Sequence, residues 1–162
     1  MPNNYFFSQD ITIDNMNNLV ERLESGEGKF NLYFATDGGS PEAMTFLIQY
    51  MNTRKDEIEV TLTDAVMSAG TKILTDFKGK INISDGLDLI MFHMWDRESY
   101  SLREGFANEK ILTDQDFEEN KIFAKKLKKK KLLTDKQIKQ FLKGKDVFIY
   151  KKQIKTWKNL HK

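Results

Sequence analysis

The order of short apolar segments and helical segments restricts this chain more than any other feature of its sequence. Five short segments are typical of strands, among them a buried one at 29–35 and an alternating one at 57–63, and segments with apolar residues at helical spacing lie between or after them. The strands are expected at 5–7, 29–35, 57–63, 80–83 and 87–94, and the helices at 11–24, 41–52 and from Ser68 to Phe77. Strands that alternate with helices predict an α/β domain.

The remaining third of the chain has a different pattern. Residues 111–131 are expected to form one long, highly charged helix with few apolar residues, too few for full burial. A second helix follows Thr134, a short strand is expected at 146–150, and a last helix at 153–160. The chain shows neither an internal repeat nor linker composition, so we expect a single domain from which the charged helix projects.

Composition excludes several classes of protein. The chain of 162 residues has no cysteine, which excludes disulfides, thiolate metal sites and a cysteine nucleophile. We expect neither a metal nor a cofactor. The first residues lack the pattern of a signal peptide, and no segment approaches the roughly 20 apolar residues needed to span a bilayer. We therefore expect a soluble, cytoplasmic protein with no membrane partner.

The formal charge of +2 conceals a division along the chain. Residues 1–120 hold 10 basic and 22 acidic side chains, whereas residues 121–162 hold 16 basic and 2 acidic ones. The lysine-rich run at 125–131 has few aromatic neighbours, and such a run on a helix is usually a solvated face, so we do not expect a nucleic-acid partner. We expect the basic region to meet acidic surface on a neighbouring subunit, and assembly to weaken with salt.

One set of residues suits acyl transfer by a serine, which needs a base and backbone donors for the oxyanion. Ser68 lies where a strand passes into a helix, and its small neighbours Ala69 and Gly70 leave room for a substrate carbonyl. The Ala69 N–H is one candidate donor. A second is the Gly39 N–H, since the Gly38-Gly39 turn has no side chain to obstruct approach. The structural alternatives are a helix cap at Ser68 and a simple tight turn at the glycines.

His93 is the candidate base, at the end of the apolar segment IMFH. The chain has only two histidines, and His161 is next to the last residue, where fraying makes an accurate catalytic geometry difficult. The structural alternative is that His93 is a packed residue of the strand. Each of these short motifs is weak evidence when taken by itself.

Taken together and in order, these segments resemble those of ClpP proteases. The segment LYFATDGGS at 32–40 resembles the strand and glycine turn of that family, and AVMSAG at 65–70 resembles its nucleophile motif. The segment at 90–93 resembles the strand that ends in the catalytic histidine, and KDVF at 145–148 the segment that carries the aspartate. The order Ser, His, Asp differs from that of the chymotrypsin, subtilisin and α/β-hydrolase triads. The resemblance covers about 6–152.

The resemblance implies a ClpP/crotonase-like fold, a spiral of strand-helix units with a long handle helix. The head would comprise about 1–110 and 144–162, and the handle about 111–143. It also implies a serine endopeptidase for proteins or peptides, with Ser68, His93 and Asp146 as the triad and Gly39 and Ala69 as oxyanion donors. In the family, two heptameric rings interdigitate their handles and enclose a chamber that an ATP-driven unfoldase feeds. We therefore expect a homo-oligomer, with stacked rings as one form.

Several positions depart from the family pattern. Asp37 stands where the family usually has proline, and Met94-Trp95 replaces a more polar turn. Trp95 either reshapes the substrate pocket or serves packing. Asp135 also lies in the region expected for the aspartate. Only the Val-Phe that follows Asp146 favours Asp146 over Asp135. The chain begins almost at its first strand, so we expect it to lack most of the axial segment that contacts an unfoldase, and that partnership stays open.

Two other functions remain compatible with this sequence. In one, the fold persists as a catalytically lapsed scaffold or assembly subunit, and Asp37 and Trp95 mark a site that has drifted. In the other, the chain is a crotonase-like acyl-CoA enzyme, which shares the fold and builds an oxyanion hole from two backbone N–H groups. That enzyme has less need of a Ser-His pair.

Overall fold

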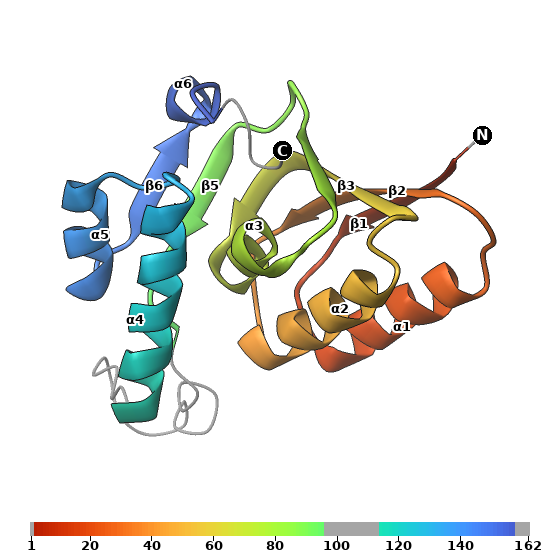
Figure 1. Cartoon of the computed structure of the whole chain (residues 1–162), viewed down its shortest axis with the longest axis horizontal. Helices are drawn as coiled ribbons and strands as arrows, with labels where there is room; N and C mark the ends of the chain where they lie inside the picture. The colour runs from red at the N-terminus through yellow and green to blue at the C-terminus, as the bar shows by residue number, and fades with distance from the viewer. Residues whose placement is uncertain (1, 96–113, 158–162) are drawn as a thin grey trace. The chain divides into compact units, whose positions relative to one another are not determined.

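The computed structural model describes residues 2–95 and 114–157, and the chain divides into two compact units (Figure 1). Unit 1 comprises Met1–Phe92 and Phe148–Lys162, and unit 2 comprises His93–Val147. The chain therefore crosses between the units twice, at the bond that follows Phe92 and at the bond that follows Val147. Unit 1 contains the sheet, and unit 2 contains a pair of helices.

The sheet of unit 1 has six strands, of which the last begins at the unit boundary. They are β1 (Asn3–Ser8), β2 (Phe30–Thr36), β3 (Ile58–Met67), β4 (Lys80–Ile83), β5 (Leu89–Phe92) and β6 (Val147–Tyr150). The order is β1-β2-β3-β5-β6, and β4 also pairs with β3. The pairs β1–β2, β2–β3, β3–β4 and β3–β5 are all parallel. The predicted α/β class is confirmed.

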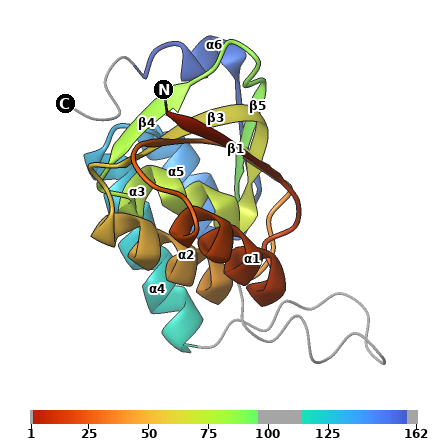
Figure 2. The same ribbon diagram turned by 90° about the vertical axis from the view of Figure 1, so that its right-hand side faces the viewer.

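Helices α1 (Ile13–Glu24) and α2 (Pro41–Thr53) lie on the same side of this sheet (Figure 2). Each begins after a hydroxyl residue whose oxygen accepts a backbone N–H of the first turn, namely Thr12 for α1 and Ser40 for α2. The buried residues of α1 follow helical spacing: Met16, Leu19, Val20 and Leu23. Alternate residues of β2 are fully buried: Phe30, Leu32 and Phe34. The pattern of α1 is the one expected from the sequence, whereas β2 was expected to be buried throughout.

Strand β3 is longer than predicted because it contains a bulge. Phe34 pairs with Leu62, and the next pair is Thr36 with Val66, so β2 advances by two residues while β3 advances by four. Asp64 has a φ of +50° within this bulge, a value uncommon for a residue other than glycine. Before the bulge β3 pairs with β4, and after it β3 pairs with β5. The predicted strand end at Thr63 was wrong, since Asp64 bends the strand instead of ending it.

The helix expected from Ser68 to Phe77 is divided into two short pieces. A 3₁₀ helix, η1, spans Ser68–Lys72, and α3 spans Ile73–Asp76. The 3₁₀ segment makes the tighter turn needed directly after the strand. Its residues Ala69, Gly70 and Thr71 are buried.

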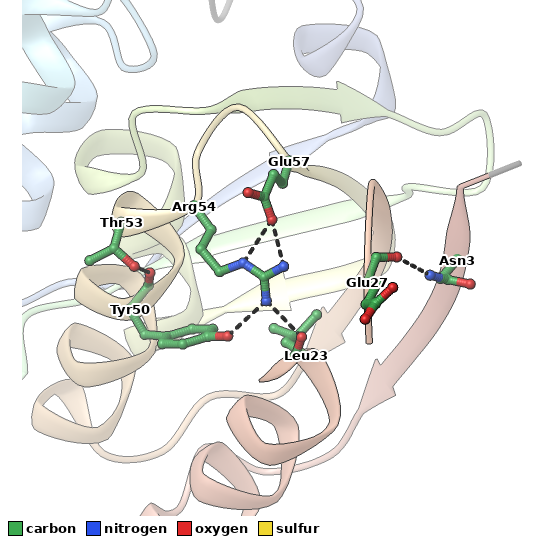
Figure 3. Close-up of polar contacts among 7 residues, drawn as sticks. All are labelled: Asn3, Leu23, Glu27, Tyr50, Thr53, Arg54 and Glu57. Carbon is green, nitrogen blue, oxygen red and sulfur yellow. Dashed lines mark hydrogen bonds and ion pairs between the residues drawn. The ribbon is translucent and has the colours of Figure 1, made fainter. Parts of the chain in front are cut away.

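Arg54, the C-cap of α2, joins several elements of unit 1 (Figure 3). Its guanidinium donates to the Leu23 carbonyl at the end of α1 (2.7 Å), to the Tyr50 hydroxyl (3.2 Å) and to the Glu57 carboxylate (2.8 Å). It also lies 4.8 Å from the centre of the Phe30 ring. Hydrogen bonds to Tyr50 and Glu57 raise the pKa of Arg54 above its ordinary value. The contacts fix the ends of both helices near the start of β3.

Unit 2 contains α4 (Asp114–Lys129) and α5 (Asp135–Leu142), which pack against each other. Thr134 and Gln137 form a capping box at the start of α5. The Phe123 and Phe141 rings lie 5.9 Å apart and are both buried. The lysines at 125, 126, 128 and 129 are exposed, as expected of a solvated face. The predicted start of α4, at 111–113, lies outside the described residues.

The last helix, α6 (Lys151–Ile154), is shorter than predicted. Within the described residues it begins two residues earlier than expected and ends at Ile154. The N–H groups of Thr156 and Trp157 bond to carbonyls three residues back, which closes the helix with a tight turn. The predicted residues 158–160 and His161 lie outside the described residues. No helix in 2–95 or 114–157 combines the length and apolarity needed to cross a bilayer.

Candidate functional site

Ser68 directly follows β3, is the first residue of η1, and has a strained backbone. Its φ is +53°, in the left-handed region that residues other than glycine rarely adopt. Met67 takes the N-cap position, so Ser68 is the first residue of the helix and the helix-cap alternative is excluded. Such strain in a residue with a side chain is maintained only where the surrounding structure imposes it, and it clusters at active sites. The residue itself is 9% exposed.

The Gly38-Gly39 turn lies directly against Ser68. A Cβ atom placed on Gly38 would be 2.6 Å from the Ser68 Cβ and 3.1 Å from its Oγ, so any side chain there would clash. Gly38 and Gly39 also have φ values of +114° and +141°. A Cβ on Gly39 would lie 2.2 Å from the Ile11 carbonyl oxygen. Both glycines are therefore required by conformation and by space.

Backbone hydrogen bonds fix the orientation of this glycine turn. The Ile11 N–H donates to the Gly38 carbonyl, and the Ser40 N–H donates to the Ile11 carbonyl, both at 2.8 Å. Among the described residues, the Gly39 N–H meets no hydrogen-bond acceptor. The Ala69 N–H is the second of η1, where the helix itself supplies no acceptor. The two N–H groups predicted to donate to the oxyanion, those of Gly39 and Ala69, are thus not bonded within a helix or a strand.

Thr71 holds the backbone carbonyl of Ser68. Its hydroxyl donates to the Ser68 carbonyl at 2.6 Å, and the residue is fully buried. Thr71 was not among the residues predicted to form the site. Its spacing of three residues from Ser68 is the one available signal, since a threonine at that spacing in a turn can bond back to the backbone.

His93 and Asp146 lie together in unit 2. His93 immediately follows β5 and Asp146 immediately precedes β6. The His93 Nδ1 and Asp146 Oδ1 atoms are 3.6 Å apart, and the side chains are 27% and 47% exposed. This separation permits an ion pair when the imidazole is protonated but exceeds a hydrogen bond. The aspartate is therefore placed to influence the imidazole.

Asp135, the second aspartate in this region, has a different partner. It is the first residue of α5, and its carboxylate lies 2.8 Å from the Lys128 Nζ. The hydrogen bond from Lys128 lowers the pKa of Asp135 below its ordinary value. Of the two aspartates that the sequence left open, Asp146 is the one that lies beside His93.

Trp95 serves packing within unit 2. It is buried, and its ring lies 4.6 Å from that of Phe123 at an angle of 50°. The side-chain amide of Asn120, on α4, pairs with both the N–H and the carbonyl of Trp95, at 3.2 and 2.9 Å. Asn120 is fully buried. This role of Asn120 was not predicted, because the sequence pattern of a single asparagine in a lysine-rich helix is that of an exposed residue.

A cleft of about 570 Å³ lies in unit 1 where β1 and β2 end and β3 bulges. Three aspartates line it: Asp10, Asp37 and Asp64. Among the residues that the structure describes, none of those lining it is a lysine or arginine. In the part of the chain that the structure describes, no three histidine, aspartate or glutamate side chains gather in a way that could hold a metal ion.

Comparison with known proteins shows similarity at the level of structure only. No protein-family model matches the sequence, and no curated protein matches it. A similar solved structure is the crystal structure of the ClpP protease catalytic domain from Plasmodium falciparum. The TM-score is 0.63 at 18% identity, over 95% of this chain and 80% of that chain. The predicted fold is therefore confirmed as a mixed α/β fold that matches a ClpP-like structure, whereas identity this low leaves function to the site.

Proposed function

We propose that this chain is a serine peptidase in which Ser68 attacks the carbonyl of a peptide bond. The observation that supports this most is the strained φ of +53° at Ser68, with Gly38 packed against its side chain. A strained strand-to-helix turn is a known way to present a serine nucleophile. The Gly39 and Ala69 N–H groups would stabilise the oxyanion of the tetrahedral intermediate.

In the proposed mechanism, His93 removes the proton of Ser68 and later donates it to the leaving amine. The strand register supports this role: Met67 and Met91 are partners across β3 and β5, Ser68 follows Met67 directly, and His93 is two residues after Met91. Asp146 would favour the imidazolium that forms during the reaction. Its distance of 3.6 Å from the imidazole suits this electrostatic role better than that of a hydrogen-bonded orienting group.

We further propose that the peptidase acts on protein or peptide substrates as a homo-oligomer, with a stacked ring as one form, in the cytoplasm. The fold supports the assembly, and the exposed lysines of α4 supply a basic surface for an acidic neighbour. Sedimentation at low and high salt tests this: we expect oligomers that weaken with salt, and a monomer under both conditions would contradict it. Dependence on an ATP-driven unfoldase stays open.

The two alternative functions have less support. A lapsed scaffold does not need the strain at Ser68, which costs about 1–3 kcal/mol and is typical of active sites. An acyl-CoA enzyme needs cations for the phosphates of its substrate, but among the described residues the cleft beside the glycine turn is lined by carboxylates and by no basic side chain.

Labelling with a fluorophosphonate tests the proposed nucleophile. We expect a single covalent adduct on the wild-type protein, detected by intact mass, and none on the Ser68→Ala variant. Ser40→Ala is a matched control, because Ser40 caps α2 and its loss affects stability instead of chemistry. A wild-type protein that is not labelled, or a Ser68→Ala protein that is still labelled, would overturn the proposal.

A further inference from the structure

Thr36 connects the glycine turn to the segment that follows β1. It is the last residue of β2 and is 4% exposed. Its hydroxyl donates to the Gln9 carbonyl at 2.8 Å and accepts from the Gly38 N–H at 3.0 Å. Because the hydroxyl has only one proton, the bond to Gln9 leaves its lone pairs available to the Gly38 N–H. The hydroxyl therefore has a defined direction.

The methyl group of Thr36 meets the serine turn. A Cβ atom placed on Gly70, two residues after Ser68, would be 2.4 Å from the Thr36 Cγ2. The methyl thus occupies the space that any side chain at position 70 would need. One buried side chain contacts the turn that contains Gly38 through its hydroxyl and the turn that contains Ser68 through its methyl.

The two peptide groups of Gly38 are fixed at both ends. Its N–H is bonded to Thr36, and its carbonyl accepts from the Ile11 N–H at 2.8 Å. The Gly38 carbonyl and the Gly39 N–H belong to one planar trans peptide and point in opposite directions. The Ile11 bond therefore holds the peptide that contains the Gly39 N–H, and the Thr36 bond holds the peptide before it, so that the two bonds together restrict the φ and ψ of Gly38 and the direction of the Gly39 N–H.

We propose that Thr36 is a positioning residue for acyl transfer, a role that rests on the proposed function. Its hydroxyl holds the Asp37–Gly38 peptide through the Gly38 N–H. Together with the bond from the Ile11 N–H to the Gly38 carbonyl, this restricts rotation at Gly38 so that the Gly39 N–H faces the developing oxyanion, and the Thr36 methyl sets the spacing between this turn and Ser68. Glycine has no preferred φ of its own, so a turn of two glycines needs external contacts to hold one orientation. Thr36 supplies the side-chain contact.

Three variants separate the hydroxyl from the methyl. Thr36→Val retains the shape and removes the hydroxyl, and Thr36→Ser retains the hydroxyl. Thr45→Val is a matched control, because the Thr45 hydroxyl donates to the Pro41 carbonyl within α2. The measurement is fluorophosphonate labelling, resolved into the maximal rate of acylation and the concentration for half-maximal rate. For Thr36→Val we expect the maximal rate to fall about 10- to 100-fold with little change in the half-maximal concentration, since a misdirected oxyanion donor acts on the transition state.

Thr36→Ser should restore the maximal rate to within about threefold of wild type, and Thr45→Val should not change it. Equal rates in Thr36→Val and wild type, or equal losses in Thr36→Val and Thr36→Ser, would overturn the role of the hydroxyl. If Thr36→Val does not fold, amide exchange of Gly38 in the wild-type protein decides: we expect protection, and exchange at the rate of an open amide contradicts the proposal. Failure of the proposed function is distinguishable, since the wild-type protein would then form no adduct while Gly38 stayed protected.

Discussion

The serine turn of unit 1 and the histidine segment of unit 2 both follow the end of a parallel strand, but they are held by different means. Ser68 has a strained backbone, a glycine of the neighbouring turn packs against its side chain, and a threonine of η1 bonds its carbonyl. The segment after β5 is not a strand at Trp95. The amide of Asn120, 25 residues away, pairs with that main chain instead.

This difference shows two ways to fix a backbone that carries a reactive group. At the serine turn the main constraint is steric, since there is no space for a Cβ at Gly38 or Gly39. At the histidine segment the constraint is a side-chain amide that reproduces the hydrogen bonds of a missing strand. Substitutions that add atoms should therefore disturb the serine turn, and substitutions that remove hydrogen bonds should disturb the histidine segment.

The largest effect is expected for Gly39→Ala. The new methyl would lie 2.2 Å from the Ile11 carbonyl oxygen, at a φ of +141°. We expect the free energy of unfolding to fall by about 4 kcal/mol, from overpacking and strain together. Chemical denaturation measures this loss.

Gly28→Ala is the control for Gly39→Ala. Gly28 also has a positive φ, +85°, but a Cβ there would meet nothing within 4 Å. Only backbone strain remains in Gly28→Ala, so we expect its free energy of unfolding to fall by about 1 kcal/mol. Equal losses in the two variants would contradict a steric constraint at the serine turn.

For Asn120→Leu we expect the free energy of unfolding to fall by less, about 3 kcal/mol. The buried N–H and carbonyl of Trp95 would both lose their hydrogen bond to the Asn120 amide. The Trp95 amide should exchange faster with solvent, and fluorophosphonate labelling of Ser68 should slow. Unfolding and amide exchange together measure the effect.

Asn52→Leu is a matched control in unit 1. Asn52 makes the same two-point contact, with the Asp76 carbonyl and the Lys78 N–H, at 3.0 and 2.8 Å. Its loss should lower stability without faster exchange at Trp95 or slower labelling. If Asn52→Leu slows labelling as much as Asn120→Leu does, the effect of Asn120 is one of general stability.

A tenfold effect on rate, or about 1.4 kcal/mol, is expected for Asp146→Asn. The carboxylate is 47% exposed and 3.6 Å from the imidazole, so its field is partly screened. The rate of labelling should fall about tenfold with little change in stability. Asp135→Asn should leave the rate unchanged, and a larger loss there would assign the histidine partner to Asp135.

The smallest effect is the pH dependence of the Lys128–Asp135 pair. Since Lys128 lowers the pKa of Asp135, the pair stabilises the fold above the ordinary aspartate pKa, and this contribution is lost as the pH falls through the lowered value. Asp135→Asn should therefore be slightly less stable than wild type at neutral pH and equally stable near pH 2. A difference that persists at that pH would contradict this origin.

Local patterns in the sequence were sufficient to predict most elements of unit 1. Apolar spacing predicts which residues of α1 are buried, although the caps at Thr12 and Ser40 were not predicted. These features depend on residues within a few positions of one another. The ClpP-like order of the glycine turn, Ser68 and His93 also follows from the sequence, and the fold that it implies is confirmed.

Several decisive features come only from tertiary structure. The strand was expected to end at Thr63, but pairing with β5 continues it beyond Asp64. Flanking residues favoured Asp146 over Asp135 without deciding between them, whereas the structure has Asp146 beside His93 and Asp135 beside Lys128.

The sequence by itself therefore determined the order of strands and helices, the glycine turn and the serine at its strand-to-helix junction, because each depends on short-range periodicity, capping and conformational freedom. Tertiary structure decided the strain at Ser68, the burial of Thr36 and Asn120 and the partner of His93. A hydroxyl or amide becomes a structural group only when packing removes water from it, and packing depends on residues distant in the chain.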